Sequence, residues 1–389
     1  MSGTLRLRHP IVVAGGGIGG LTFAVALQRR GLAVRVLERA HALEPAGAGL
    51  ALQPNAMAVM AGLGLAEAVT AAGRRIGIAA ILNERGAPLG RPQDMAALSA
   101  SFGSPAIALH RARLHRVLQD AVAAGTITLG VEVVDYERRG EGVVVRCADG
   151  STFETELLVG ADGLRSKVRR QVVRDGEPTY AGYTSWRGVT SAGRGPRLGR
   201  MSESWGRGER FGMVEIGHDE IYWFAVANAA PGGTDRDVQQ ELLARFGGWH
   251  APIADVVRAT PVDRIIRTDI SDRDPVSVWH DGPVVLLGDA AHPMTPNLGQ
   301  GACQAIEDAA VLAEALAGSD TVAAAIRAYE ERRVRRANAV VRAARSLGAV
   351  AQWSQPVAVL LRTAALRMTP DGVMRRQVQS LWRAPEALG

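Results

Sequence analysis

The segment IVVAGGGIGGLTFAVALQRRGLAVRVLER, residues 11–39, decides the fold of this chain. The apolar residues 11–13 predict a buried parallel strand, after which the chain enters a glycine-rich turn. Thr22–Arg30 predicts a helix that Gly31 terminates, and Leu32–Leu37 predicts the next strand. The segment therefore predicts a β-α-β unit at the start of a mixed α/β fold.

Glycines in this turn follow the spacing of a dinucleotide-binding site. Gly15 is expected to make the tight turn, and Gly20 to let the helix pack on the strand. Gly17 and Gly19 are expected to leave room for a pyrophosphate at the helix N-terminus. Glu38 ends the second strand, where its carboxylate accepts hydrogen bonds from ribose hydroxyls and repels a 2′-phosphate. The pattern thus predicts a Rossmann-like domain that binds FAD or NAD rather than NADP.

The composition is that of an ordinary globular protein. The 389 residues are 47% hydrophobic and 22% charged, enough for a sizeable core or two domains. No apolar run reaches the ~20 residues of a membrane span and no signal peptide precedes residue 11, so we expect a cytoplasmic location. Cys147 and Cys303 stand in no CxxC or Cys/His cluster, which predicts no metal site.

Charge is distributed along the chain and its net value is +6. We interpret it as a solvated surface, with attraction of anionic cofactors or small acidic substrates as the alternative. The arginine-rich residues 329–346 predict a charged, solvent-exposed helix face. Interleaved aromatic residues or a known nucleic-acid module are missing from the sequence, so no nucleic-acid partner is expected.

Two further glycine-containing motifs follow predicted strands. LLVGADGLRSKVRR, residues 157–170, passes from an apolar strand through Asp162 into a basic helix. PVVLLGDAAHPMTPNLGQGACQAIEDAAVLAEAL, residues 283–316, places Asp289 at a strand end, where its carboxylate can bond a polyol. Gly299–Gly301 then present backbone N–H groups and the positive end of a long helix to another edge of the ligand.

With three such motifs in this order, the chain resembles the single-component FAD-dependent aromatic hydroxylases of the para-hydroxybenzoate hydroxylase type. HRARLHRVL, residues 110–118, is similar to the family's RxxL element. GYTSWRG, residues 182–188, resembles the branch that includes urate, salicylate and alkyl-quinolone hydroxylases. The resemblance implies an NAD(P)H-dependent monooxygenase that hydroxylates an aromatic or heteroaromatic small molecule with molecular oxygen, through a flavin C4a-hydroperoxide. It also implies non-covalent FAD and transient docking of NAD(P)H, because no second GxGxxG opens a helix.

The resemblance implies a set of residues along the cofactor. At the adenosine end, Glu38 and Arg39 hold the nucleotide and Val133 contacts adenine through its backbone. Arg111 reaches the phosphate and ribityl region, unless it is only a surface charge, and Asp289 binds ribityl hydroxyls. The full set expected to bind FAD is Gly15, Gly17, Gly19, Glu38, Arg39, Gly49, Arg111, Val133, Asp162, Asp289, Gly299, Gln300, Gly301, Ala302 and Cys303.

Several of these residues have simpler structural interpretations. Gly49 is implied to lie beside the flavin, and Gly299–Cys303 to place backbone amides at its pyrimidine edge. Asp162 belongs to the motif linked to FAD and the nicotinamide nucleotide, or else forms only a tight turn and helix cap. We expect Cys303 to be a buried apolar residue rather than a flavin attachment, and His292 to serve packing rather than base catalysis. The catalytic base stays unassigned.

The substrate pocket is expected between an antiparallel sheet and the flavin. Its candidate walls, chosen by alternation along predicted strands and by position in the third motif, are Trp186, Arg187, Met213, Tyr222, Phe224 and Pro293. The strand residues could equally form ordinary sheet core, and Arg187 could equally form a surface ion pair as bind an anionic substrate.

The expected domains interleave along the chain. Residues 1–75, 109–178 and 279–348 form the FAD-binding domain, residues 76–108 and 179–278 the substrate domain, and residues 349–389 a C-terminal helical segment. Residues 357–368 are amphipathic, which fits a helix packed on the domain junction or one docked on a membrane surface. A monomer and a homodimer are both compatible with the sequence. A dehydrogenase, a halogenase without the WxWxIP motif of that family, or a non-catalytic binding protein remain as alternatives.

Overall fold

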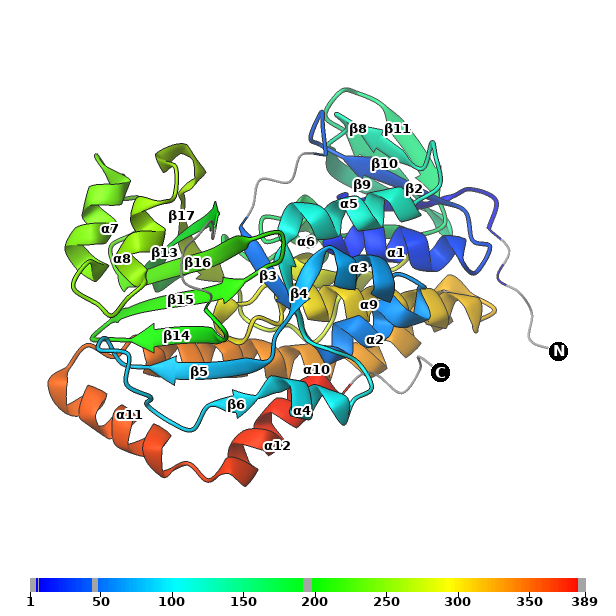
Figure 1. Ribbon diagram of the computed structural model, residues 1–389. Coiled ribbons are helices and arrows are strands. Elements are labelled where there is room, and N and C mark those ends of the chain that lie inside the picture. The colour runs from blue at the N-terminus through cyan, green and yellow to red at the C-terminus, as the bar shows by residue number, and fades with distance from the viewer. Residues whose placement is uncertain (1–4, 6, 44–47, 192–197, 384–389) are drawn as a thin grey trace.

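The computed structural model describes Leu5 and residues 7–43, 48–191 and 198–383. The nucleotide-binding part is built on a mixed sheet with the strand order β18-β19-β12-β1-β2-β8 (Figure 1). Its strands are β1 (Ile11–Ala14), β2 (Val34–Glu38), β8 (Ile127–Leu129), β12 (Leu158–Gly160), β18 (His280–Asp281) and β19 (Val284–Leu286). All neighbours are parallel except β18, which runs antiparallel to β19.

Helix α1 (Ile18–Gln28) begins four residues earlier than the expected helix at Thr22. It packs against α5 (Arg111–Ala121) and α9 (Gly301–Ala317), and α9 packs against α10 (Val322–Ala351). Apolar residues of these elements form the largest core cluster of the molecule. Three strands, β9 (Val133–Arg139), β10 (Gly142–Cys147) and β11 (Thr152–Thr155), form a separate antiparallel sheet.

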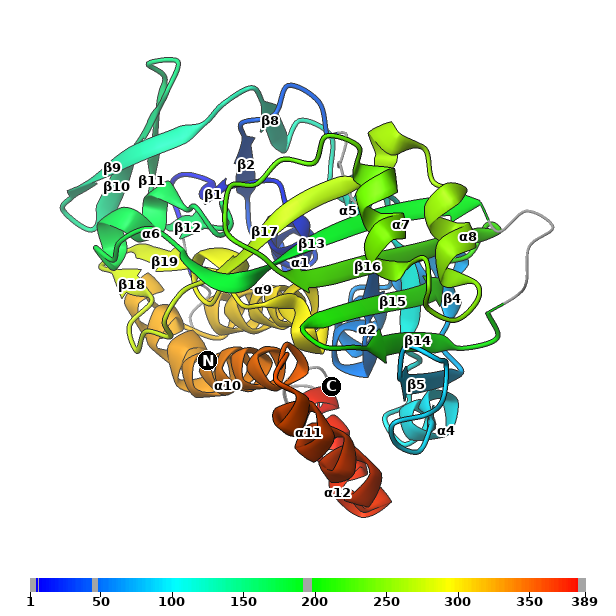
Figure 2. The same cartoon turned by 90° about the vertical axis from the view of Figure 1, so that its left-hand side faces the viewer.

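The substrate part is a seven-stranded sheet with the order β17-β13-β16-β15-β14-β5-β6. Its strands are β5 (Ile78–Leu82), β6 (Gln93–Asp94), β13 (Thr179–Ser191), β14 (Met201–Trp205), β15 (Glu209–Glu215), β16 (Glu220–Asn228) and β17 (Ile266–Asp272). The sheet is not wholly antiparallel as expected, because β14 and β5 pair in parallel. Helices α7 (Val238–Phe246) and α8 (Ile253–Arg258) cover one face of it (Figure 2).

A small sheet, β3 (Gly49–Leu52), β7 (Ile107–His110) and β4 (Gly73–Arg75), lies between the two parts. The expected domain boundary between residues 108 and 109 falls inside β7, and the one between 348 and 349 falls inside α10. Each element continues across the expected boundary, because its backbone hydrogen bonds are formed on both sides of it.

The C-terminal helices α11 (Pro356–Met368) and α12 (Asp371–Trp382) run along the lower side of the molecule in Figure 1. The remaining helices are α2 (Pro54–Gly62), α3 (Ala66–Ala71), α4 (Met95–Ala100), α6 (Lys167–Val172) and the 3₁₀ turns η1 (Val262–Arg264), η2 (Gly288–Ala290) and η3 (Pro296–Leu298). Across the described ranges, none of the helices combines the length and the apolar character needed to cross a bilayer.

Candidate cofactor and substrate site

The glycine turn between β1 and α1 is shaped by close backbone contacts. Gly15 has φ +107°, and a Cβ on it would lie 2.4 Å from the carbonyl oxygen of Ala161. A Cβ on Gly20 would lie 2.1 Å from the carbonyl oxygen of Gly15. Around Gly17, by contrast, a Cβ would meet no described atom within 4 Å. The N-terminus of α1, with no acidic residue and no side-chain cap, therefore opens onto free space beside Gly17.

Gly19 lies where α1 packs against α9. A Cβ on Gly19 would lie 2.7 Å from Leu287 and 3.2 Å from Ala305 of α9. The missing side chain therefore allows α1 to approach α9 and the end of β19.

Glu38 lies at the end of β2, directly beside the glycine turn. Its carboxylate accepts hydrogen bonds from the backbone N–H of Gly16 (2.7 Å) and of Ala40 (2.9 Å). Each carboxylate oxygen keeps a second lone pair, so both can still accept from ribose hydroxyls. Arg39 is exposed next to it. Val133 is buried at the start of β9, which follows β8, the neighbour of β2 in the sheet.

Asp289 lies in a recess of the structure. Its side chain is exposed to solvent, yet the surrounding protein desolvates it and raises its pKa, against the charges of His292 and Arg111. Arg111 is exposed at the first turn of α5, and no hydrogen bond or ion pair joins its side chain to another described residue. A Cβ on Gly301 would lie 3.8 Å from the Asp289 carboxylate, so η2 and the start of α9 share this recess. Pro293, in the loop between η2 and η3, is buried.

The N-terminus of α9 also opens toward solvent. Gly299 is exposed with φ +61°, and the N-cap residue Gln300 makes no side-chain cap. Gln53, which the sequence analysis did not identify, supports this turn by donating to the carbonyl of Leu298 (3.0 Å). The Gln53 side-chain carbonyl accepts from Gln300 (2.5 Å) and from the indole N–H of Trp382 in α12 (2.6 Å).

Cys303 is fully buried, and burial raises the pKa of its thiol to about 12. Its sulfur accepts a hydrogen bond from the backbone N–H of Gln53 at 3.5 Å and lies 3.7 Å from the carbonyl oxygen of Ala51. These contacts give it a packing role between α9 and β3. Ala302 beside it is half-buried.

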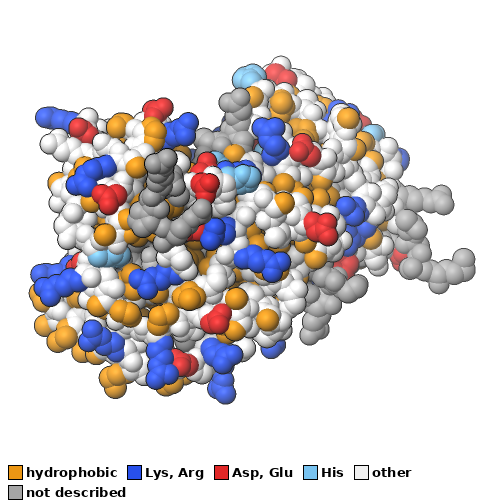
Figure 3. Space-filling view, viewed as in Figure 1, with side chains coloured by type: hydrophobic (Ala, Val, Ile, Leu, Met, Phe, Trp, Pro, Cys, Tyr) orange, Lys and Arg blue, Asp and Glu red, His pale blue; other side chains and the backbone are white. Residues whose placement is uncertain are grey.

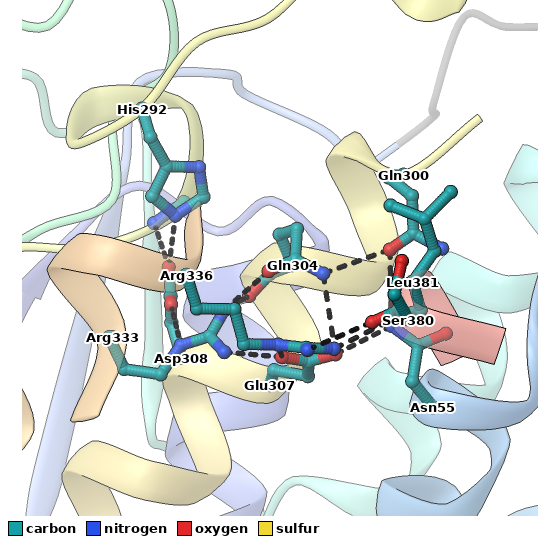
Figure 4. A network of polar contacts seen from close by, with 11 residues as sticks. Asn55, His292, Gln300, Gln304, Glu307, Asp308, Arg333, Arg336, Ser380 and Leu381 are labelled. Carbon is teal, nitrogen blue, oxygen red and sulfur yellow. Dashed lines mark hydrogen bonds and ion pairs between the residues drawn. The ribbon is translucent and has the colours of Figure 1, made fainter. Parts of the chain in front are cut away.

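Behind the α9 turn lies a buried network of charged side chains, shown in Figure 4. Arg333 of α10 is ion-paired with Glu307 and with Asp308, the latter at 2.7 Å. His292 contacts Asp308 at 2.5 Å, and Arg336 contacts Glu307 at 2.8 Å. Burial opposes ionisation, but the charges of His292 and Arg333 outweigh it and lower the pKa of Asp308 to about 2. The expected solvent-exposed arginine face is wrong at residue 333, whose side chain is completely buried.

This network extends to the α9 N-terminus. Arg333 donates to the Gln304 side chain (2.7 Å), and Gln304 donates to Gln300 (2.9 Å). Asn55 of α2 donates to both Gln300 (3.1 Å) and Glu307 (2.6 Å). The position of the α9 turn is therefore set by buried polar contacts from α2, α9 and α10 (Figure 4).

Side chains of the second motif, residues 157–170, form hydrogen bonds with backbone groups in this structure. Asp162 accepts from the Ser166 hydroxyl (2.5 Å) and the Lys167 N–H (2.8 Å), and so caps α6. Arg169 of the same motif is completely buried and donates to the carbonyl oxygen of Ala290 in η2 (3.0 Å). The motif thus fixes the loop that carries Asp289.

Two of the expected pocket residues lie on the helix-covered face of the large sheet. Trp186 and Met213 are buried with Phe211 and Phe246 in the cluster beneath α7 and α8. The Trp186 indole donates to Asp235 at 2.6 Å. Strand alternation identified two faces but not which of them the helices cover, so we no longer assign Trp186 and Met213 to the pocket.

Arg187, Tyr222 and Phe224 lie on the opposite face. Arg187 pairs with Phe224 across β13 and β16, and the Tyr222 and Phe224 rings are 6.0 Å apart. A Cβ on Gly49 would lie 2.5 Å from the Tyr222 ring, so β3 packs directly against this face. Burial raises the pKa of Tyr222, while the charges of Arg187 and Glu203 act on it in opposite directions. On this face, therefore, the rings of Tyr222 and Phe224 lie near the Arg187 guanidinium.

Arg210 is a further buried cation that the sequence analysis did not identify. It donates to Glu203 (2.9 Å), to Asn297 of η3 (2.8 Å) and to Gln352 (2.7 Å). These bonds connect the large sheet to the loop before α9. Asn297 lies in the third motif, residues 283–316, whereas its partner Arg210 on β15 lies in no recognisable motif.

Comparison with known proteins gives matches over nearly the whole chain. Residues 8–344 match the family described as FAD binding domain. The chain is 48% identical to the aurachin C monooxygenase/isomerase of Stigmatella aurantiaca over 374 residues, covering 95% of this chain and 97% of that one. It is 33% identical to the FAD-dependent urate hydroxylase of Klebsiella pneumoniae over 338 residues, covering 86% and 88%. The structure of Klebsiella pneumoniae HpxO complexed with FAD and uric acid superposes with a TM-score of 0.90, 28% identity and coverage of 97% and 98%.

Proposed function

This chain belongs to the FAD-binding domain family, and we propose that it oxygenates aurachin C or a close chemical relative of that compound. As an FAD-dependent monooxygenase, it uses NAD(P)H to hydroxylate an aromatic or heteroaromatic small molecule. The observation that carries the substrate proposal is the 48% identity that extends over 95% of this chain and 97% of its relative. Relatives that act on 3-amino-4-hydroxybenzoate are 37% identical or less.

We propose that the recess holds FAD in an extended form. The open α1 N-terminus beside Gly17 fits the pyrophosphate, because it offers N–H groups where a Cβ would meet nothing. Glu38 would take the adenosine ribose, and Asp289 with Arg111 the ribityl and phosphate region. The α9 N-terminus at Gly299 would face the flavin. Bound there, the flavin supplies hydride acceptance and oxygen activation.

The protein's own part in the reaction is placement, electrostatics and exclusion of water. The positive end of α9, with its free N–H groups, stabilises negative charge on a ligand edge placed beside it. Tyr222 and Phe224 present aromatic faces against which a planar substrate can stack. Arg187, half-buried beside Tyr222, orients a substrate oxygen that carries negative charge. Close packing of Gly49 on Tyr222 leaves no space for water between β3 and this face of the sheet.

The substrate proposal is tested by a panel with the purified FAD-loaded protein. Aurachin C, 3-amino-4-hydroxybenzoate and urate are compared for stimulation of NAD(P)H oxidation and for a product heavier by one oxygen atom. We expect aurachin C to give the highest kcat/KM and a stoichiometric oxygenated product. Faster coupled turnover of either other compound would refute the substrate proposal while leaving the monooxygenase assignment intact.

The cofactor placement is tested by Asp289→Ala. This change removes the carboxylate that lines the recess, and the purified variant is expected to lose most of its bound FAD, measured by absorbance at the flavin band. Asp120→Ala, on the exposed side of α5, is the matched control and should retain the cofactor. Full FAD occupancy in Asp289→Ala would contradict the placement.

A further inference from the structure

The outward face of α11 is apolar, whereas its inward face carries a charge. Val357, Leu360, Leu361 and Met368 are 70%, 68%, 62% and 79% exposed, and they recur at helical spacing along one side of the helix. Helices of globular proteins normally bury such a stripe. Here the stripe has no covering element among the described residues, and Figure 2 shows α11 at the margin of the molecule.

The inward side of α11 is fixed by a buried arginine. Arg362 is 2% exposed and donates to the carbonyl oxygens of Ala351 and Gly206, both at 2.7 Å. Its guanidinium also stacks over the Trp205 ring at 5.4 Å. Leu366 packs on the same side, against the cluster that contains Trp205. These contacts hold the helix in one rotation, with the apolar stripe turned outward.

Along α11 and α12, exposed charge is almost entirely positive. Arg367, Arg375, Arg376 and Arg383 are exposed on and beyond α11 and α12. The single acidic residue between positions 352 and 383 is Asp371, and Arg91 neutralises it with a 2.7 Å ion pair. Hydrophobic and basic side chains accordingly gather along the lower edge of the space-filling view in Figure 3.

We propose that α11 and α12 dock the protein on an anionic membrane surface, with α11 lying in the interfacial plane. A helix with outward Val, Leu and Met side chains and flanking arginines has the chemistry of an interfacial anchor, and it is far too short to span a bilayer. Trp353, 39% exposed just before α11, supplies an aromatic side chain of the kind enriched at the headgroup level. Each exposed arginine adds attraction to anionic lipid.

The charge pattern favours a membrane over a second copy of this chain. A two-fold dimer places the same patch against itself, which would bring two sets of the arginines at positions 367, 375 and 376 into one interface. Like charges across an interface destabilise it, whereas an anionic lipid surface attracts all of them.

Flotation of the FAD-loaded protein with vesicles tests the proposal. Vesicles of phosphatidylcholine and phosphatidylglycerol are compared with vesicles of phosphatidylcholine alone, at low and high salt. We expect binding to the anionic vesicles and its weakening by salt. Leu360→Asp with Leu361→Asp should reduce binding by at least roughly ten-fold, because two leucines that would insert into the membrane are lost. Arg375→Gln with Arg376→Gln should reduce binding by about five-fold per arginine.

The matched control carries aspartate at two exposed valines elsewhere, Val262→Asp with Val278→Asp, which are 54% and 52% exposed in the wild type. It should float like the wild type, and all variants should keep their FAD and their rate of NAD(P)H oxidation. Failure of the wild type to float with anionic vesicles, or equal flotation of the leucine variant, would overturn the proposal. So would a concentration-dependent dimer that the leucine variant dissociates, because the stripe would then be occupied by a second copy.

Discussion

Replacing Arg333 with methionine is expected to lower the free energy of unfolding by about 3–5 kcal/mol at pH 7, because it leaves buried carboxylates without their main partner. The structure supports this magnitude. The charges of His292 and Arg333 together lower the pKa of Asp308 from 3.8 to about 2, which corresponds to about 2 kcal/mol at roughly 1.4 kcal/mol per pH unit, and Arg333 supplies part of it. Glu307 also stabilises the folded state when ionised, since the charge of Arg333 helps to lower its pKa against the effect of burial.

The sign of the pH dependence follows from the lowered pKa. The Asp308 contribution is fully present above the unfolded-state pKa of about 4 and is lost as the pH falls toward 2. The loss of unfolding free energy caused by Arg333→Met should therefore be largest near neutral pH and become smaller below pH 4. Urea unfolding followed by circular dichroism measures this free energy at each pH. Arg332→Met is the control, because Arg332 pairs with Glu314 at the surface and should change stability by about 1 kcal/mol or less. Equal losses in the two variants would refute the reasoning.

Three other substitutions and one labelling reaction separate local roles. Gly17→Ala should leave the FAD-free fold intact and weaken FAD binding, whereas Gly20→Ala should destabilise the fold itself, since its Cβ would lie 2.1 Å from a backbone oxygen; thermal unfolding and FAD titration distinguish the two. Gly49→Ala should displace the Tyr222 ring, whose nearest atom is 2.5 Å from the new Cβ, and should raise KM for the substrate more than it changes FAD affinity. Cys303, with a pKa of about 12, should resist alkylation at pH 8 in the native protein and react after denaturation; rapid native labelling, read by mass spectrometry, would contradict its burial.

The nucleotide-binding unit could be predicted from sequence because its determinants are local. Gly20 and Glu38 make their close contacts with Gly15 and Gly16, within one strand-turn-helix-strand segment, so these contacts follow from the local spacing. The sequence predicts the start of α1 four residues too late, because the glycines in its first turn have low helix propensity. In the structure this turn is helical, and Gly19 packs there against α9.

Contacts between distant elements could not be predicted in the same way. Arg333 occurs in an arginine-rich stretch that reads as a solvated surface, and only the packing of α10 on α9 places it beside Glu307. Alternation along β13 separated Trp186 from Arg187, but the identity of the covered face depends on α7 and α8, which follow later in the chain. Gln53 has no motif around it, and its importance arises from partners on α9 and α12.

The hydrogen bond from Trp382 to Gln53 has a consequence for biosynthesis. Trp382 lies close to the C-terminal end of the chain, whereas its partner precedes α2. Because α12 follows the nucleotide-binding elements in the chain, this support beneath the Gly299 turn can form only after those elements have been synthesised. A deletion that removes Trp382 is therefore expected to loosen the Gln53 support of the Gly299 turn.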